Sequence, residues 1–297
     1  MRLIARPRPI GVLALFLAGM IGLGFTTKAG ARALEDIQRR GVLSLCAAPN
    51  ALPFASKRGE RPGYQIELGR TLAERLGVRL QVEWVILSYQ YRAVDCDIAM
   101  DTIADQEAQG ENELRWSAPY YRSGVALAVR PGNDGITGFD SLGQERRVGV
   151  LQGSLAHMYL EQRGARTVPF GFEDDMLADL AAGELDAAAA TPISIGYYNL
   201  EHRGAQLRLV YAYDAVPELS WDLAVGMRRS DRFLRKAIDQ AVQAMLDDGT
   251  FERIYASYGI EHRPPERQAA VRIERKEPLE EGECVRLGRS RECTPSR

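Results

Sequence analysis

Four cysteines carry the clearest chemistry in this chain, and they fall into two pairs. Cys46 ends one short apolar run and Cys96 opens another, whereas Cys284 and Cys293 lie close together in a polar tail. Both runs are typical of buried strands, and neighbouring parallel strands would bring the first pair together. In an oxidising compartment we predict two disulfides, Cys46–Cys96 and Cys284–Cys293. A zinc site is the competing interpretation, weakened by the absence of paired CxxC units.

The compartment is indicated by residues 1–33, which we interpret as a signal peptide. Three arginines precede an apolar run from 10 to 25, and Ala31 and Ala33 occupy the two positions that a signal peptidase reads. The run is short for a membrane span, so export is favoured over an uncleaved N-terminal anchor. We therefore expect a periplasmic protein with no membrane attachment after cleavage.

A strongly acidic segment from Asp101 to Glu113 is the next candidate for chemistry. It could attract a cation or a basic partner surface, but a solvated loop face is the ordinary interpretation. The glycine and closing glutamate of a calcium loop are missing, so we predict neither a metal nor a cofactor. The formal net charge of −2 argues against a nucleic-acid binder.

Catalytic motifs are missing from the sequence. It contains no GxSxG, HExxH or GxxxxGK[ST] pattern, and its three histidines are scattered without a motif. A general base would therefore have no expected orienting partner. We predict a binding protein and not an enzyme.

The elements that must position a site alternate between strand and helix, which predicts an α/β fold with parallel-rich sheets. After the cluster of turn formers at 131–135 a second unit of the same kind begins, and a return strand follows near 221–227. The expected order is helix 34–41, strand 42–46, loop 49–63, helix 63–77, strand 78–85, strand 97–103, strand 124–129, strand 147–151, a helix from Ser154, helix 174–183, strand 185–190 and strand 221–227.

The chain closes with a helix that we expect to begin at the cap Ser230 and to end at Gly249, followed by a short helix to Tyr258. Only half of a capping box is present, because Phe233 stands where a carboxylate would complete it. Apolar residues recur at helical spacing and predict the inward face. They are Phe233, Leu234, Ala237, Ile238, Ala241, Val242, Met245 and Leu246.

This order predicts two lobes joined by two crossovers, near 125–129 and 223–227, with a cleft lined by strand ends and helix N-termini. The expected division is signal peptide 1–33, first part of lobe one 34–126, lobe two 127–223, return to lobe one 224–262 and charged tail 263–297. We interpret the tail as a solvated segment closed by Cys284–Cys293, and a partner-docking extension is the alternative. We expect a monomer.

Taken together, these pieces resemble the periplasmic solute-binding proteins of family 3 over about residues 34 to 260. The resemblance implies a type II periplasmic binding-protein fold, with two lobes and two hinge crossovers. No single piece decides it, but their number and order do. The matching segments are 34–43, 52–54, 63–68, 116–121, 148–154, 183–187 and the closing helix pair.

Amino-acid-binding members of that family hold their ligand by two charges, and both are missing here. An arginine follows the strand corresponding to 97–103 and grips the ligand carboxylate, whereas residues 97–114 of this chain contain no lysine or arginine. An aspartate ends the strand corresponding to 186–190 and holds the ammonium group, but Thr191 stands at that position. Amino-acid binding is therefore disfavoured.

Three departures look like one branch of the family, the J-type accessory proteins of methanol dehydrogenase systems (the MxaJ/XoxJ group). They are Cys46 before the 52–54 segment, Cys96 before the 97–100 strand, and the run 191–198. The resemblance implies a non-catalytic partner of a PQQ-dependent methanol or alcohol dehydrogenase, with its cytochrome c as a further candidate partner. The alternative is a receptor that delivers a non-amino-acid solute, of unknown identity, to an ABC importer.

The residues expected at the cleft each have a structural alternative. Phe54 and Tyr120 would otherwise pack a loop against the lobe, Asp101 would cap a turn, and Ser154 would be a plain helix cap. Tyr197 and Tyr198 belong either to the cleft rim or to a helix core. The cleft candidates are Asn50, Phe54, Tyr64, Gln65, Asp101, Thr102, Tyr120, Gly153, Ser154 and Thr191.

Overall fold

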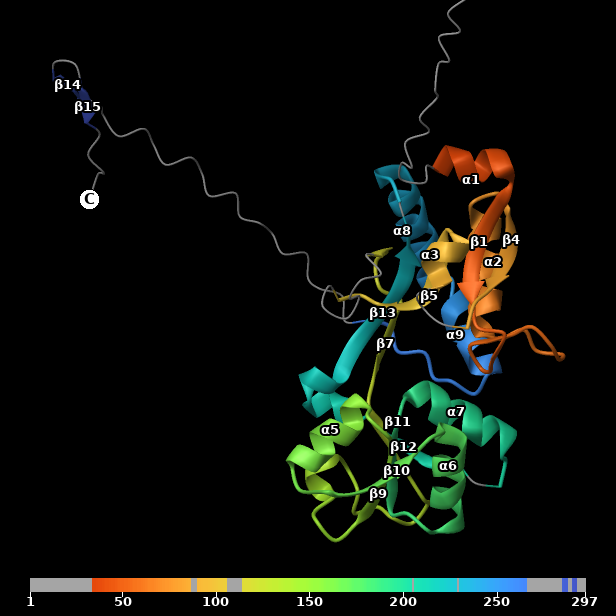
Figure 1. Ribbon diagram of the computed structural model, residues 1–297, viewed down its shortest axis with the longest axis vertical. Coiled ribbons are helices and arrows are strands. Elements are labelled where there is room, and N and C mark those ends of the chain that lie inside the picture. Colours follow the sequence, from red (N-terminus) through yellow and green to blue (C-terminus); the bar gives the residue numbers. More distant parts are fainter. Residues whose placement is uncertain are drawn as a thin grey trace, which may run out of the picture.

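A computed structural model describes residues 34–86, 90–105, 114–204, 206–228, 230–265, 285–287 and 290–292. The expected signal peptide, most of the acidic segment and the Cys284–Cys293 pair lie outside these residues. Two sheets, each with its own apolar core, form two lobes that lie one above the other in Figure 1. The predicted fold class is confirmed.

Lobe 1 is built on a six-stranded sheet in the order β4-β1-β5-β13-β6, with β7 paired to β13. The strands β1, β4 and β5 are parallel, and β13 runs antiparallel to its neighbours. The strands are β1 Val42–Ala47, β4 Arg79–Trp84, β5 Ile98–Ile103, β6 Arg115–Trp116, β7 Tyr121–Gly124 and β13 Ser220–Met227. The helices are α1 Leu34–Arg40, α2 Tyr64–Arg75, α3 Gln90–Val94, α8 Arg232–Asp247 and α9 Thr250–Ser257, and a small hairpin joins β2 Asn50–Ala51 to β3 Ala55–Ser56.

Lobe 2 is built on a five-stranded sheet in the order β10-β9-β11-β8-β12. Its strands are β8 Ala126–Val129, β9 Arg147–Leu151, β10 Arg166–Phe170, β11 Ala187–Ala190 and β12 Arg208–Val210. Its helices are α5 Leu155–Gln162, α6 Glu173–Ala182 and α7 Pro192–Glu201, with short 3-10 turns η2 Phe139–Ser141, η3 Ala212–Ala215 and η4 Pro217–Leu219. In the tail, β14 Val285–Leu287 pairs with β15 Ser290–Glu292 in an antiparallel hairpin.

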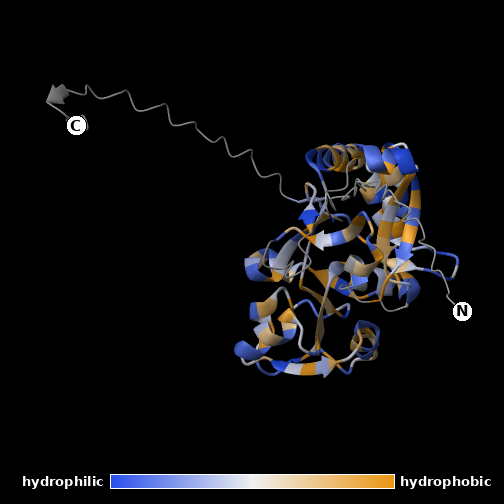
Figure 2. Cartoon of the chain, turned by 45° about the horizontal axis from the view of Figure 1, so that its top comes forward, coloured by the Kyte–Doolittle hydropathy of each residue, from blue (hydrophilic) through white to orange (hydrophobic). Residues whose placement is uncertain are grey.

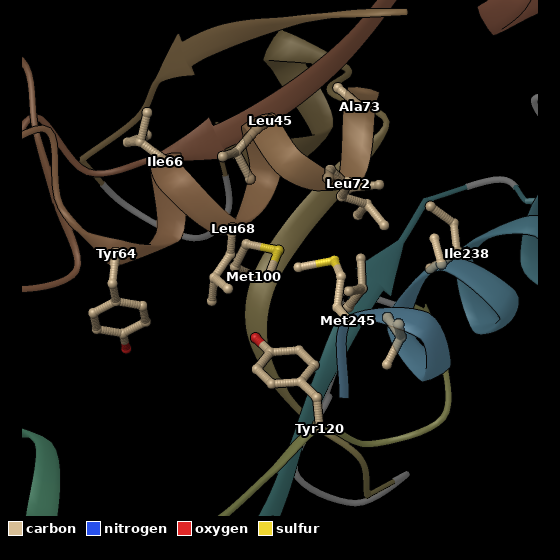
Figure 3. Close-up of a cluster of buried hydrophobic side chains, with 14 of the residues drawn as sticks. Leu45, Tyr64, Ile66, Leu68, Leu72, Ala73, Met100, Tyr120, Ile238 and Met245 are labelled. Carbon is tan, nitrogen blue, oxygen red and sulfur yellow. The ribbon is translucent and has the colours of Figure 1, made fainter. Parts of the chain in front are cut away.

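The core of lobe 1 forms where α2 and α8 cover the sheet. Leu45, Leu72, Met100 and Met245 come from four different elements and meet in one cluster (Figure 3). Hydrophilic residues lie on the outer faces of the helices, as the hydropathy colouring of Figure 2 shows. Burial of the apolar face of each amphipathic helix is the main source of helix stability in such a fold.

Both sheets turn the carboxyl ends of their parallel strands toward the junction between the lobes. In lobe 2 the end of β11 pairs with the start of β8, directly after the chain enters the lobe. In lobe 1 the end of β5 pairs with β13 close to the point where the chain returns. Ligands of open α/β sheets bind at this edge, so the junction is the place to look for a site.

The two crossovers run side by side, and the N–H of Val125 donates to the carbonyl of Leu219 at 2.8 Å. The chain therefore changes lobes at 124–125 and again just before Ser220. The expected boundary at 223/224 falls inside β13, which lies wholly in the sheet of lobe 1. The sequence alone predicts such a boundary poorly, because the apolar pattern of a buried strand does not indicate to which of the two sheets the strand belongs.

A third connection crosses the junction. Residues 260–265, here called the strap, follow α9 and lie against both lobes (blue in Figure 1). His262 bonds through its ring Nε2 to the carbonyl of Tyr120 at 2.7 Å in lobe 1. Arg263 donates to the hydroxyl of Tyr213, a core residue of lobe 2, at 3.0 Å, and pairs with both carboxylate oxygens of Asp214.

Helix α7 also touches lobe 1. Ile193 and Tyr197 pack against the core of lobe 1, whereas Ile195 and Tyr198 belong to the core of lobe 2. A Cβ placed on Gly196 would lie 2.4 Å from the carbonyl oxygen of Gly259, the residue just before the strap. The absence of side chains at these two glycines lets α7 approach the backbone after α9 directly.

The predicted Cys46–Cys96 disulfide is confirmed, with the two Cα atoms 5.6 Å apart. The physical reason is the one expected from the sequence: β1 and β5 are adjacent parallel strands, and Cys46 pairs with Ala99. The prediction for the start of α8 is wrong by one residue, because Asp231 accepts the N–H of Leu234 and is the cap. Phe233, expected in the core, lies on the outer side with 57% of its surface exposed, because it is about 100° around the helix from the buried Leu234.

Within the described ranges, we find no helix that combines the length and apolar character needed to span a bilayer.

Candidate functional site

A cavity of about 560 Å³ lies between the lobes and is here called the interlobe cavity. Residues of both lobes line it. Lobe 1 contributes Asn50, Ala51, Leu52 and Ser56 from the β2–β3 hairpin, and lobe 2 contributes Asp174, Tyr197, Tyr198, Glu201 and His202 from α6, α7 and the residue after α7. A larger cavity of about 930 Å³ is lined, among the described residues, by lobe 1 and the strap alone, so it does not bridge the lobes.

Asp101, the acid expected at the cleft, is directed into lobe 1 instead. Its Oδ1 accepts the hydroxyl of Tyr120 at 2.7 Å, and its Oδ2 accepts the hydroxyl of Tyr64 at 2.6 Å and the amide of Gln65 at 2.7 Å. The Tyr120 hydroxyl also lies 2.7 Å from the Asp101 backbone N–H. Four of the ten cleft candidates therefore meet, but as an internal cluster.

A β-bulge explains this orientation. The register of β13 against β5 shifts between Ala224 and Gly226, which leaves Met100 and Asp101 together opposite a single residue. Asp101 has a φ of 54°, in the left-handed region that a side chain seldom adopts. A bulge of this kind redirects a side chain and breaks the strict alternation of strand faces.

Electrostatics agree with a closed cluster. Burial raises the pKa of Asp101, and the hydrogen bonds from Tyr64, Gln65 and Tyr120 lower it in part. Burial and the nearby Asp101 charge raise the pKa of Tyr64 and Tyr120 well above the ordinary value, so both hydroxyls remain donors. Both tyrosines are fully buried, and their rings belong to the lobe 1 core (Figure 3).

Two further candidates, Phe54 and Thr102, are also directed into lobe 1. The Phe54 ring is half-buried with its centroid 5.5 Å from that of Tyr64, which is the loop-packing role considered from the sequence. Thr102 is buried and donates to the carbonyl of Ala99 at 3.4 Å. In contrast, Asn50 is exposed and lines the interlobe cavity.

At the start of α5, two backbone donors are used by the protein itself. Ser154 caps the helix, and its Oγ accepts the N–H of His157 at 3.1 Å. The His157 ring folds back, so that its Nδ1 accepts the N–H of Gly153 at 3.1 Å, and its Nε2 lies 3.0 Å from Glu161. An anion would have to displace this imidazole to use the Gly153 N–H.

Thr191, at the end of β11, is likewise engaged. Its hydroxyl caps α7 by accepting the N–H of Ser194 at 3.2 Å and lies 3.0 Å from the Ser194 hydroxyl. Ser194 in turn donates to Glu173. Burial raises the pKa of Glu173, and the bond from Ser194 lowers it in part. A carboxylate therefore does stand near Thr191, but it is bound to a side chain of the same lobe.

The charges at the interlobe cavity are acidic. Asp174 and Glu201 line it, and no lysine or arginine does so among the described residues. The positive charge of Arg61 lowers the pKa of Tyr197 in part, although burial raises that pKa overall. The Arg61 guanidinium itself donates to the carbonyl of Ser257 at 3.1 Å and lies 5.6 Å from the Tyr258 ring centroid. Sequence reasoning missed Asp174, Glu201 and His202, because each looks like an ordinary surface residue at a helix end.

The sequence matches a known family of binding proteins over most of its length. The model of the bacterial extracellular solute-binding proteins, family 3, matches residues 43–261. The chain belongs to this family. The lysine/arginine/ornithine-binding periplasmic protein of Escherichia coli K12 is 28% identical over 263 residues, covering 83% of this chain and 95% of the relative.

Solved structures of solute-binding proteins share the fold. The L-cystine solute receptor of Neisseria gonorrhoeae, in its unliganded open conformation, superposes with a TM-score of 0.66 at 18% identity, covering 78% of this chain and 99% of the receptor. The periplasmic binding protein XoxJ of Methylobacterium extorquens AM1 superposes with a TM-score of 0.60 at 20% identity, covering 74% and 99%. At such identities the likeness concerns the fold alone.

Proposed function

We propose that this family 3 protein is a non-catalytic periplasmic accessory protein of a PQQ-dependent methanol or alcohol dehydrogenase system, and that it does not deliver free amino acids. The observation that carries this proposal is the internal use of three positions that the sequence places at the cleft. Asp101 is bound within lobe 1, Gly153 donates to His157, and Thr191 caps α7.

The energetic consequence for an amino acid is large. Each charge-assisted hydrogen bond to a ligand carboxylate or ammonium contributes about 1.5–3 kcal/mol, and the described residues offer no cationic group for the carboxylate at the interlobe cavity. An α-carboxylate there would instead face Asp174 and Glu201. Binding of a zwitterion is therefore disfavoured.

The dehydrogenase partner is proposed from the sequence resemblance to the J-type proteins. The Cys46–Cys96 bond supports it, because the two cysteines are among the residues that carry that resemblance. The likeness to XoxJ is compatible with it at the level of the fold. Relatives named as binding proteins support the non-catalytic part of the proposal.

The experiment has two arms. The chain, isolated from its native host, is expected to copurify with a PQQ-dependent dehydrogenase and to show no thermal shift with millimolar glutamate, histidine, lysine or cystine. A stabilisation of several degrees by any of these amino acids would contradict the proposal. Absence of a dehydrogenase both from the copurified proteins and from the neighbouring genes would contradict the partner.

A second function is favoured by one observation. The interlobe cavity is bordered by both lobes, which is the arrangement expected of a receptor that closes on a solute. A receptor that delivers a non-amino-acid solute to an ABC importer is therefore the alternative. Neighbouring genes for a permease and an ATPase would favour it.

A further inference from the structure

We propose that the interlobe cavity binds an organic amine or guanidine that has an apolar body and no carboxylate. The proposal names a ligand class for the second candidate function, on which it rests. It does not depend on the dehydrogenase partner.

The first step is the position of the cavity. One wall is the β2–β3 hairpin of lobe 1 and the other is the second half of α7 with the start of α6, so an occupant would touch both lobes. Its volume of about 560 Å³ lies within the range of roughly 300–1,000 Å³ typical of small-molecule sites. A ligand that contacts both walls favours whichever lobe arrangement brings them together.

The second step is the charge of the lining. Asp174 is the second residue of α6 and Glu201 is the last residue of α7, so the two carboxylates come from different helices. Neither forms an ion pair with a lysine or arginine within the ranges that the structure covers. Burial raises the pKa of Tyr197, the charges of Glu201 and Asp174 raise it further, and the charge of Arg61 lowers it in part. A cation in the cavity would therefore contact a lining that carries two carboxylates, while Arg61 lies outside that lining.

The third step is the apolar and aromatic part of the lining. Tyr197 is half-buried, and Tyr198 stacks on His202 with ring centroids 4.2 Å apart. Leu52 supplies an exposed aliphatic group from the opposite wall. An aromatic face attracts an ammonium or guanidinium group, and the aliphatic side chain would cover the rest of such a ligand.

The fourth step excludes a carboxylate on the ligand. Arg61, the arginine that acts electrostatically on Tyr197, is engaged by the Ser257 carbonyl and the Tyr258 ring, and it does not line the cavity. A carboxylate would lose its water without gaining a cationic partner and would meet two like charges. The lining thus selects an amine over the corresponding amino acid.

Matched ligand pairs test this selection by isothermal titration calorimetry on the mature chain at pH 8. The probes are tyramine against tyrosine and agmatine against arginine, which differ only in the carboxylate. We expect at least one amine to bind, and to bind about tenfold or more tighter than its amino acid, because a carboxylate would forfeit its charge-assisted bonds.

Three variants test the location. D174N and E201Q are each expected to weaken amine binding by about three- to fivefold, as for a partly exposed ion pair. D175N is the control, because it removes the same charge from the same turn of α6 without changing the lining. Equal weakening by D175N and D174N would overturn the placement of the site.

The outcomes separate the two proposals. If neither amine binds with a Kd of about 1 mM or lower, which corresponds to a binding free energy on the order of −4 kcal/mol, this inference is wrong and the accessory function stands. If tyrosine or arginine binds as tightly as its amine, the inference and the proposed function both fail. If an amine binds selectively and D174N and E201Q weaken it, the cavity is a receptor site for that class.

Discussion

Asp101 illustrates how a single residue decides what the lobe junction offers a ligand. Its carboxylate satisfies two tyrosine hydroxyls and one amide that would otherwise be buried without partners. A buried donor that loses its acceptor costs about 1–3 kcal/mol. The cluster therefore stabilises lobe 1 and withdraws the acid from ligand binding.

Substitution of Asp101 tests this structural role. D101A is expected to lower the free energy of unfolding by at least about 2 kcal/mol, because Tyr64 and Tyr120 both lose an acceptor. D101N should cost less, since asparagine keeps one carbonyl oxygen and tolerates the left-handed backbone. Urea denaturation measures both values. Equal stability of D101A and the unaltered chain would contradict the role.

His262 is the residue for which a pH dependence follows from the structure. Its ring stacks on Tyr255 and Phe251, and burial lowers its pKa below the ordinary 6.5, although the bond to the Tyr120 carbonyl and the charge of Glu252 raise it in part. The unfolded chain therefore binds a proton at His262 more readily than the folded chain does. Acidification below about pH 6.5 favours unfolding through this group.

The expected result is a free energy of unfolding that falls as the pH is lowered from 7.5 to 5.5. The His262 share of the slope is at most about 1.4 kcal/mol per pH unit, since one proton is taken up. In H262Q that share should disappear, whatever the variant's stability at pH 7.5. Denaturant titrations at four pH values measure the slopes, and identical slopes for the two chains would contradict the assignment.

Helix ends are the elements for which sequence and structure differ most. The apolar spacing of 233–246 predicts α8, and the core positions from Leu234 to Met245 agree with it. The cap is one residue later than predicted, because aspartate at 231 and serine at 230 are both good caps and only backbone geometry chooses between them. Phe233 was also misplaced, because it lies beside the buried face that Leu234 and Ile238 define and not on it.

The cap makes a prediction for the stability of α8. D231A should lower the free energy of unfolding by about 1 kcal/mol, because the Leu234 N–H loses its acceptor. S230A is the control and should change it by less than about 0.5 kcal/mol, since the buried Ser230 hydroxyl has no hydrogen-bond partner within the described ranges. Thermal denaturation compares the two, and the reverse order would restore Ser230 as the cap.

Strand pairing explains why the disulfide was predictable and the Asp101 cluster was not. Apolar runs ending or beginning in cysteine predict adjacent buried strands, and β1 and β5 are indeed neighbours. The faces of β5 could not be predicted, because a bulge opposite β13 changes the alternation of side chains in mid-strand. The cavity lining was missed for a different reason, since Asp174 and Glu201 come to line one cavity only when α6 and α7 pack.

The disulfide joins residues 50 positions apart, and its removal tests its share of stability. The C46A/C96A double variant should lose about 2–4 kcal/mol of unfolding free energy, because the unfolded chain regains the freedom of a long loop. Urea denaturation with and without reductant measures this. A reductant effect of the same size in the double variant would assign the stabilisation to the remaining cysteines instead.

On the scale of the whole molecule, three segments of the described chain contact or connect both lobes. Two are the paired crossovers, and the third is the strap, which binds Tyr120 of lobe 1 through His262 and Tyr213 and Asp214 of lobe 2 through Arg263. Most of this architecture, including the return of the chain to lobe 1, is predicted by the order of strands and helices. The strap is not, because polar residues beyond a final helix carry no periodic signal.

The close approach of Gly196 to Gly259 gives an experimental handle on cleft width. Alanine at 196 suits a helix better than glycine, yet its methyl group would meet the Gly259 carbonyl. G196A is therefore expected to push α7 away from the backbone at Gly259, which widens the junction between the lobes and raises the radius of gyration in X-ray scattering. G171A, where a Cβ meets nothing within 4 Å, is the matched control. Unchanged scattering of G196A would mean that the lobes already rest apart in solution.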